Sequence, residues 1–134
     1  MKKSVISILL ALVMVFTVAI TAFAAIADDN VAVPYYTYIG TTATSFTVNT
    51  FSCDATGDIC GRNGTIKVNI KLQLQKENDG VWSTVETWEK TFNGVSGELA
   101  GSATISPFSN YRLKAVYTAY TSSDSETLVA YRYE

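Results

Sequence analysis

Two tryptophans and a carboxylate form the most distinctive chemical pattern in the sequence. Trp82 and Trp88 are six positions apart in a run of strand-forming residues, and Glu86 lies between them. In a regular strand these three residues share one face, and six positions span about 20 Å. Two exposed indole rings with a polar group between them are suited to stack on sugar rings. Trp82, Trp88 and Glu86 are therefore a candidate ligand-binding set.

The same strand also supports a structural interpretation of the tryptophans. Polar and apolar residues occur on both of its faces, so period-two alternation does not decide which face points inward. A β-bulge would send one tryptophan into the core and the other outward. The competing interpretation is that at least one of Trp82 and Trp88 packs in the core or covers a sheet edge.

The two cysteines are the next candidate site. Cys53 and Cys60 are seven positions apart. In an exported chain, two cysteines predict a disulfide, which would tie a strand at residues 50–56 to the loop after it. A redox-active pair is the alternative, but the C-x-x-C spacing is absent. A free dithiol is the third possibility.

Oxygen ligands occur in the same region. Asp54, Asp58 and Asn63 could together contact Ca²⁺. However, the EF-hand spacing is absent, and turns favour these residue types for conformational reasons. We therefore expect no metal site.

Catalysis finds little support in the residue types. The chain has no His, which excludes a His general base and the usual His ligands of zinc, copper and iron. Serines are plentiful, but no G-x-S-x-G motif occurs. Glu86 and Glu89 fall on opposite faces of a strand, so they do not converge as an acid–base pair. The sequence predicts a non-enzyme without a cofactor, and a small carboxylate-dependent hydrolase is the remote alternative.

The elements that would position these residues are strands. In residues 65–76, Ile66, Val68, Ile70, Leu72 and Leu74 alternate with polar residues, which predicts a strand with one buried face. Asp79-Gly80 is a hairpin signal, and residues 81–92 form the return strand. Further strands are expected at residues 35–40, 44–48, 50–56, 98–106, 110–120 and 127–133. About seven short strands with frequent turns predict an all-β antiparallel β-sandwich.

The N-terminal residues read as an export signal. Residues 1–24 contain a short basic start, an apolar core and the cleavage sequence Ala22-Phe23-Ala24. A second Ala-x-Ala places an alternative cleavage after Ala27. The expected organisation is a signal peptide at 1–24 and one β-sandwich domain at 25–134. We expect a secreted protein with no membrane anchor after cleavage.

The charge of the chain restricts its partners. The formal net charge is −2, and removal of Lys2 and Lys3 makes it more negative. The remaining basic residues are scattered along the sequence, which disfavours nucleic acid, anionic polymers and anionic lipids as partners.

One run resembles a known family of sandwiches. Residues 105–115 read ISPFSNYRLKA. This run resembles the approach to strand F of fibronectin type III and related immunoglobulin-like domains. The resemblance implies an immunoglobulin-like antiparallel β-sandwich in which Tyr111 is the tyrosine-corner residue, whose hydroxyl bonds nearby backbone.

The whole mature chain also resembles a family of short, uncharacterised secreted proteins from Firmicutes. The resemblance rests on LQLQK at 72–76, WSTV at 82–85, YRLKA at 111–115, SET at 125–127 and Ala130-Tyr131. It implies a Gram-positive secreted β domain and supplies no catalytic residues. The expected function is a non-catalytic interaction or structural module whose partner is an envelope protein or a polysaccharide. A carbohydrate-binding module that uses Trp82 and Trp88 is the alternative.

Overall fold

The computed structural model describes residues 36–134, which form seven β-strands and no helix. The strands are β1 (Ile39–Val48), β2 (Ser52–Gly61), β3 (Lys67–Asn78), β4 (Val81–Asn93), β5 (Ser96–Thr104), β6 (Tyr111–Tyr120) and β7 (Ser125–Tyr133). The expected signal peptide and both of its cleavage positions lie outside the described residues. Within residues 36–134, no helix is long and apolar enough to cross a membrane.

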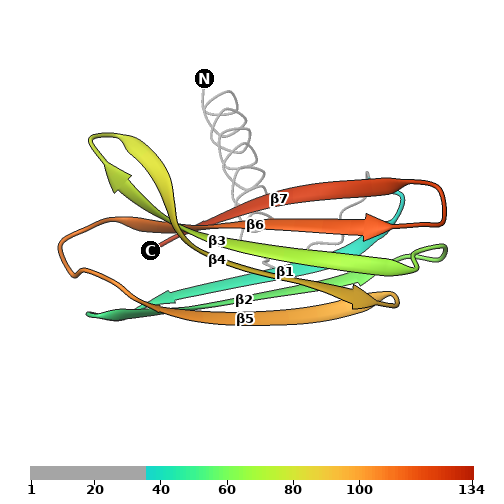
Figure 1. Ribbon diagram of the computed structural model, residues 1–134, viewed down its shortest axis with the longest axis horizontal. Coiled ribbons are helices and arrows are strands. Elements are labelled where there is room, and N and C mark those ends of the chain that lie inside the picture. The colour runs from blue at the N-terminus through green and yellow to red at the C-terminus, as the bar shows by residue number, and fades with distance from the viewer. Residues whose placement is uncertain (1–35) are drawn as a thin grey trace, which may run out of the picture.

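The strands form two layers (Figure 1). One sheet has the strand order β1-β2-β5, and the other has the order β4-β3-β6-β7. Every pairing between neighbours is antiparallel. The connections after β2, β4 and β5 pass from one sheet to the other, so both layers are built from segments distributed along the chain. The expected all-β architecture of antiparallel strands is confirmed.

The two central strands of the four-stranded sheet, β3 and β6, supply most of the core. Alternate residues of both strands are buried, as expected for a sheet with one face against a core. The buried residues are Val68, Ile70, Leu72, Leu74, Tyr111, Leu113, Ala115, Tyr117 and Ala119. Ile66 differs from the expectation: it is 56% exposed. The reason is that β3 begins at Lys67, which leaves Ile66 in the connection before it.

A buried tyrosine joins the two sheets by hydrogen bonds. Tyr117 on β6 is fully buried, and its hydroxyl donates to the carbonyl oxygen of Ala43 at 2.8 Å. It also lies 2.7 Å from the hydroxyl of Thr44. Gly57 on β2 makes room for this contact, because a Cβ there would lie 2.8 Å from the tyrosine hydroxyl. Burial raises the pKa of Tyr117, so its hydroxyl stays protonated and available as a donor.

The position of Gly57 explains one difference from the sequence-based strands. Residues 57–60 were expected to form a loop, because Gly and Asp are typical turn residues. Instead, β2 continues without a break to Gly61. Gly57 leaves space for the Tyr117 side chain instead of forming a turn. Because β2 is continuous, Cys53 and Cys60 lie in the same strand.

Charged side chains close the flank between β1 and β7. The carboxylate of Glu126 accepts the backbone N–H groups of Thr37, Tyr38 and Ile39 at 2.8, 2.7 and 2.9 Å. Near the other end of β7, Nε of Arg132 donates to the carbonyl oxygen of Thr44 at 3.2 Å. Both strands are edge strands, and inward-pointing charges on edge strands also discourage pairing with other chains.

Aromatic side chains close the opposite flank, between β4 and β5. Trp88 and Phe92 of β4 are half-buried and pack against the main core cluster. Their rings lie against Gly101 and Gly97 of β5, where any Cβ would overlap the ring atoms. Glycine on β5 thus lets the two sheets approach each other at this flank.

We predict that Gly101→Val destabilises the protein, because the added side chain must displace the Trp88 ring. The expected loss in the free energy of unfolding is about 1–3 kcal/mol, as for other overpacked cores. Urea denaturation followed by tryptophan fluorescence measures it. Ala100→Val is the matched control, since Ala100 is the exposed neighbour on β5. Equal stability of the two variants would contradict this packing.

A second prediction concerns pH. Burial raises the pKa of Glu126, but the three backbone N–H groups and Arg62 lower it by more, so the folded-state pKa lies below the ordinary 4.5. The stabilisation by Glu126 is therefore complete above about pH 4.5 and is lost as the pH falls through the folded-state pKa.

Glu126→Gln should cost about 1 kcal/mol at pH 7, after allowance for solvent screening. This difference from the unchanged protein should shrink below about pH 4.5. Thermal unfolding from pH 7 to pH 3 measures both values, with Glu86→Gln as the control at an exposed carboxylate on β4. A cost of Glu126→Gln that does not change with pH would contradict the assignment.

Candidate functional site

A β-bulge separates the two tryptophans. From Glu86 onward, β4 pairs with β3 in one register, with Glu86 opposite Leu74. Before Val85 the register is shifted, with Thr84 opposite Gln75. Val85 is the extra residue. Trp88 lies opposite buried Leu72 and faces the core, whereas Trp82 lies opposite Glu77 on the outer face. The structure therefore does not bring Trp82 and Trp88 together on one surface.

Glu86, the third member of the candidate set, does not join Trp82 either. It directly follows the bulge and lies opposite Leu74, on the same side of β4 as Trp88. Its side chain is exposed because β4 is an edge strand. The carboxylate that does lie across from Trp82 is Glu77 of β3.

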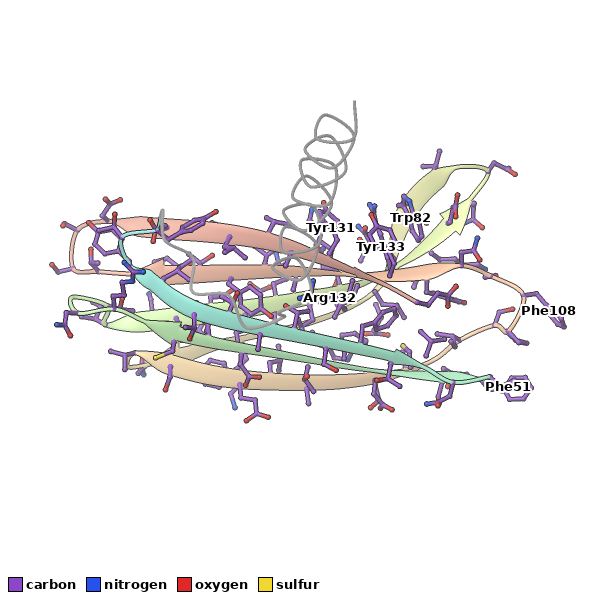
Figure 2. All side chains as sticks on the ribbon, turned by 180° about the vertical axis from the view of Figure 1, so that it is seen from behind. Phe51, Trp82, Phe108, Tyr131, Arg132 and Tyr133 are labelled. Atoms are coloured by element: carbon purple, nitrogen blue, oxygen red, sulfur yellow. The ribbon has the colours of Figure 1, made fainter. Side chains whose placement is uncertain are left out.

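Trp82 instead belongs to a group of side chains on the outer face of the four-stranded sheet. We call Trp82, Arg112, Tyr131 and Tyr133 the aromatic–arginine cluster. The guanidinium carbon of Arg112 lies 4.5, 4.6 and 6.0 Å from the ring centroids of Trp82, Tyr131 and Tyr133. The rings of Trp82 and Tyr133 meet edge to face, with centroids 6.1 Å apart. Figure 2 shows the three aromatic residues grouped near the β3–β4 hairpin.

Hydrogen bonds orient the arginine within this cluster. Nε of Arg112 donates to Oε1 of Gln75 at 2.8 Å, and Nη1 donates to the hydroxyl of Tyr133 at 3.3 Å. Gln75 in turn donates to the hydroxyl of Thr84 at 3.3 Å. A guanidinium has five N–H donors, so several of them have no hydrogen-bond partner within the described residues. The arginine is thus positioned by rings and by two hydrogen bonds, and it keeps donors for a ligand.

A hollow of about 330 Å³ adjoins the cluster. Trp82 and Tyr133 line it together with polar groups from Glu77, Asn110 and Glu134. The Asn110 amide donates to Glu77 at 3.2 Å, which orients both groups. Aromatic walls with a few convergent polar groups are typical of small-ligand sites.

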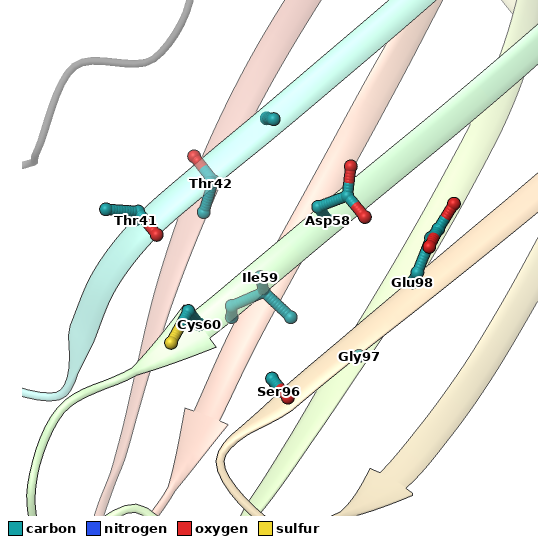
Figure 3. A pocket seen from close by; sticks show the side chains of 9 residues that line it. Thr41, Thr42, Asp58, Ile59, Cys60, Ser96, Gly97 and Glu98 are labelled. Carbon is teal, nitrogen blue, oxygen red and sulfur yellow. The ribbon is translucent and has the colours of Figure 1, made fainter.

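A second hollow, of about 350 Å³, lies over the three-stranded sheet (Figure 3). Asp58 and Glu98 face each other there across β2 and β5, and Cys60 lies beside Ser96. Burial, and then the charge of Glu98, raise the pKa of Asp58. None of the side chains that line this hollow is aromatic, and most are short. The hollow therefore offers little contact area to a ligand.

The expected disulfide between Cys53 and Cys60 is wrong. Both residues lie in β2, where seven positions span about 23 Å, whereas bonded cysteines have Cα atoms within about 7 Å. An odd number of steps also places them on opposite faces: Cys53 is buried and Cys60 is exposed. Both are free thiols, and they are too far apart to act as one redox pair.

The same strand separates the oxygen ligands considered for calcium. Asp54 and Asp58 are four positions apart on the exposed face of β2, which is about 13 Å, and Asn63 follows the strand. No group of three His, Cys, Asp or Glu side chains within residues 36–134 is arranged to hold a metal ion.

Tyr111 begins β6 and is buried in the smaller of two core clusters, beside Leu74, Cys53 and Ile105. Its hydroxyl accepts the backbone N–H of Ser106 at 3.0 Å, five residues upstream. This contact has the geometry that a tyrosine corner requires.

Sequence reasoning did not find Arg112, Tyr131 and Tyr133 as site residues. A usable signal exists, because Tyr131 and Tyr133 alternate along one strand and so share a face. Their pairing with β6, which puts Arg112 opposite Tyr133, depends on the strand register and is not local information.

No family model and no curated protein matches this sequence. Among solved structures, the chain is similar to a β-glucosidase from Kluyveromyces marxianus, with 14% identity and a TM-score of 0.37. The alignment covers 74% of this chain and 15% of that one. The same enzyme in complex with glucose gives 11% identity, a TM-score of 0.36 and coverage of 75% and 15%. The chain thus spans about 15% of the length of these structures, and a likeness at this level carries no argument about function.

We predict that the purified protein has two titratable thiols without added reductant. In the native state Cys60 should react quickly with an aromatic disulfide reagent. Cys53 should react only on unfolding, because it is inaccessible and its pKa is raised, chiefly by burial. Cys60→Ser should abolish the fast reaction and leave the slow one. Absence of free thiols in denaturant would contradict the structure.

Proposed function

We propose that this protein is an exported, non-catalytic interaction module of the cell envelope or extracellular space. Its binding face is the outer face of the four-stranded sheet. The observation that carries the proposal is the aromatic–arginine cluster, which keeps large rings and an ordered guanidinium at the surface. Tyr133 is 61% exposed and Tyr131 is 39% exposed. Clustered exposed Trp, Tyr and Arg side chains are typical of binding hot spots.

The fold we assign to this module is an immunoglobulin-like sandwich of the fibronectin type III kind. The strand orders β1-β2-β5 and β4-β3-β6-β7 support this assignment. The bond from Ser106 to the hydroxyl of Tyr111 supports it as well. Export is inferred from residues 1–24, and the resemblance of the sequence to secreted Firmicute proteins implies the same.

A binding role fits the arrangement of the polar groups better than a catalytic one. The neighbouring carboxylates Asp58 and Glu98 lie on a sheet surface among short side chains, without an enclosed cleft. The guanidinium of Arg112 is held by aromatic rings and hydrogen bonds, as expected for a recognition residue.

Among the candidate ligands, a saccharide is favoured by the hollow beside Trp82 and Tyr133. Its aromatic walls suit the apolar face of a sugar ring, and Glu77, Asn110 and Glu134 can accept or donate to hydroxyl groups. An envelope protein is the other candidate partner. It would use the same exposed rings as anchors.

The test is retention of the mature chain, starting at Ala25, on insoluble polysaccharides and purified peptidoglycan. We expect Trp82→Ala to reduce the affinity about tenfold or more, because it removes a wall of the hollow and a ring that packs on Arg112. Phe51→Ala is the matched control. It removes an exposed ring from the β1–β2 turn, away from the cluster (Figure 2). Equal retention of Trp82→Ala and the unchanged protein would contradict the proposed binding face.

A further inference from the structure

We propose that the outer face of the four-stranded sheet binds an acidic saccharide, whose carboxylates lie along a stripe of cations on β3 and β6. This inference rests on the proposed function and adds the chemical class of the ligand. We call Arg112, Lys114, Lys71 and Lys67 the basic stripe. They are half of the eight Lys and Arg residues that follow the expected signal peptide.

Strand alternation and register bring these cations together, although they are far apart in the sequence. All four occupy outward positions of the two central strands. In the β3–β6 register, Arg112 lies opposite Gln75, Lys114 opposite Gln73, Lys71 opposite Val116 and Lys67 opposite Tyr120. Successive outward rows are about 7 Å apart, so the stripe extends about 27 Å along the sheet.

The other outer face of the sandwich has the opposite character. The outward positions of β2 and β5 carry Asp54, Asp58 and Glu98. None of the outward positions of the described β1, β2 and β5 carries a Lys or Arg. The net negative charge of the chain therefore conceals a separation of charge between its two faces. An anionic ligand is attracted to one face and repelled by the other.

The acidic groups on the basic face lie beside Lys71 and at the hollow next to Trp82. Glu89 pairs with Lys71 at 3.7 Å, with both side chains exposed to solvent. Glu77 and Glu134 lie at the hollow, at the Trp82 end. The ammonium of Lys67 is held over the Tyr120 ring at 4.6 Å. Carboxylates of a ligand are thus directed toward Arg112 and Lys114, and its hydroxyl groups toward the hollow.

Arg112 is suited to hold a carboxylate at this position. Its stacking on Trp82 and Tyr131 reduces the side-chain entropy that a flexible arginine would lose on binding. Its remaining N–H donors can form paired, charge-assisted hydrogen bonds with a carboxylate. The exposed rings beside it distinguish an acidic saccharide from an acidic peptide, because the rings offer flat apolar surfaces to sugar rings.

The experiment compares three soluble probes by isothermal calorimetry with the mature chain. The first probe is polygalacturonate. The second is the same polymer with its carboxylates methyl-esterified, which keeps the sugar rings and removes the charge. The third is poly-L-glutamate, which keeps the charge and removes the sugar rings. We expect binding of polygalacturonate only, and a loss of affinity as the NaCl concentration rises.

Charge variants locate the binding face. Arg112→Gln should weaken the binding of polygalacturonate about tenfold or more. Lys114→Gln should weaken it by up to about fivefold, as for an exposed ion pair. Lys90→Gln is the matched control, because Lys90 lies on the other side of β4, over the Phe92 ring. We expect this control to bind like the unchanged protein.

The outcomes separate this inference from the proposed function. Equal binding of the esterified polymer, or of poly-L-glutamate, overturns the acidic saccharide as the ligand. If Trp82→Ala still lowers retention on an insoluble bait in that case, the proposed binding face stands. Binding of polygalacturonate that Arg112→Gln leaves unchanged overturns the basic stripe. Absence of binding to all three probes overturns the inference outright.

Discussion

The β-bulge at Val85 is the feature on which both the packing and the candidate site depend. Without an extra residue in β4, Trp82 and Trp88 would share one face, because they are six positions apart. The bulge directs Trp88 between the sheets, where it packs on Gly101, and directs Trp82 outward, where it meets Arg112 and Tyr133. One local irregularity therefore gives two chemically similar residues separate roles.

The two flanks of the sandwich are closed in different ways, and this leaves the outer faces free to differ. Trp88 seals the β4–β5 flank by apolar packing, and Glu126 and Arg132 seal the β1–β7 flank by bonds to backbone groups. Between these flanks, Tyr117 links the sheets across the core. The side chains of the outer faces contribute little to holding the two sheets together. One outer face can therefore present short acidic side chains, and the other can present aromatic rings and cations.

The sequence predicted the regular parts of the fold well. Period-two alternation identified the buried face of β3, and Asp79-Gly80, both with positive φ, forms the predicted β3–β4 turn. The errors have one cause: they depend on space or register rather than on local pattern. Gly57 was interpreted as a turn residue, but it makes room for Tyr117 within a continuous strand. Because a loop was expected there, the sequence did not show that Cys53 and Cys60 are far apart in one strand. Similarly, Arg112 meets Trp82 and Tyr131 only through strand pairings that the sequence does not specify.

The most direct test of the binding face is an NMR titration of the isotope-labelled mature chain with an oligogalacturonate. The two indole N–H signals and the arginine Nε–H signals report separate surfaces in one experiment. Our account predicts progressive shifts of the Trp82 indole and the Arg112 Nε–H signals, while the Trp88 indole signal stays in place. Shifts confined to residues of the three-stranded sheet, or an unmoved Trp82 signal, would contradict it.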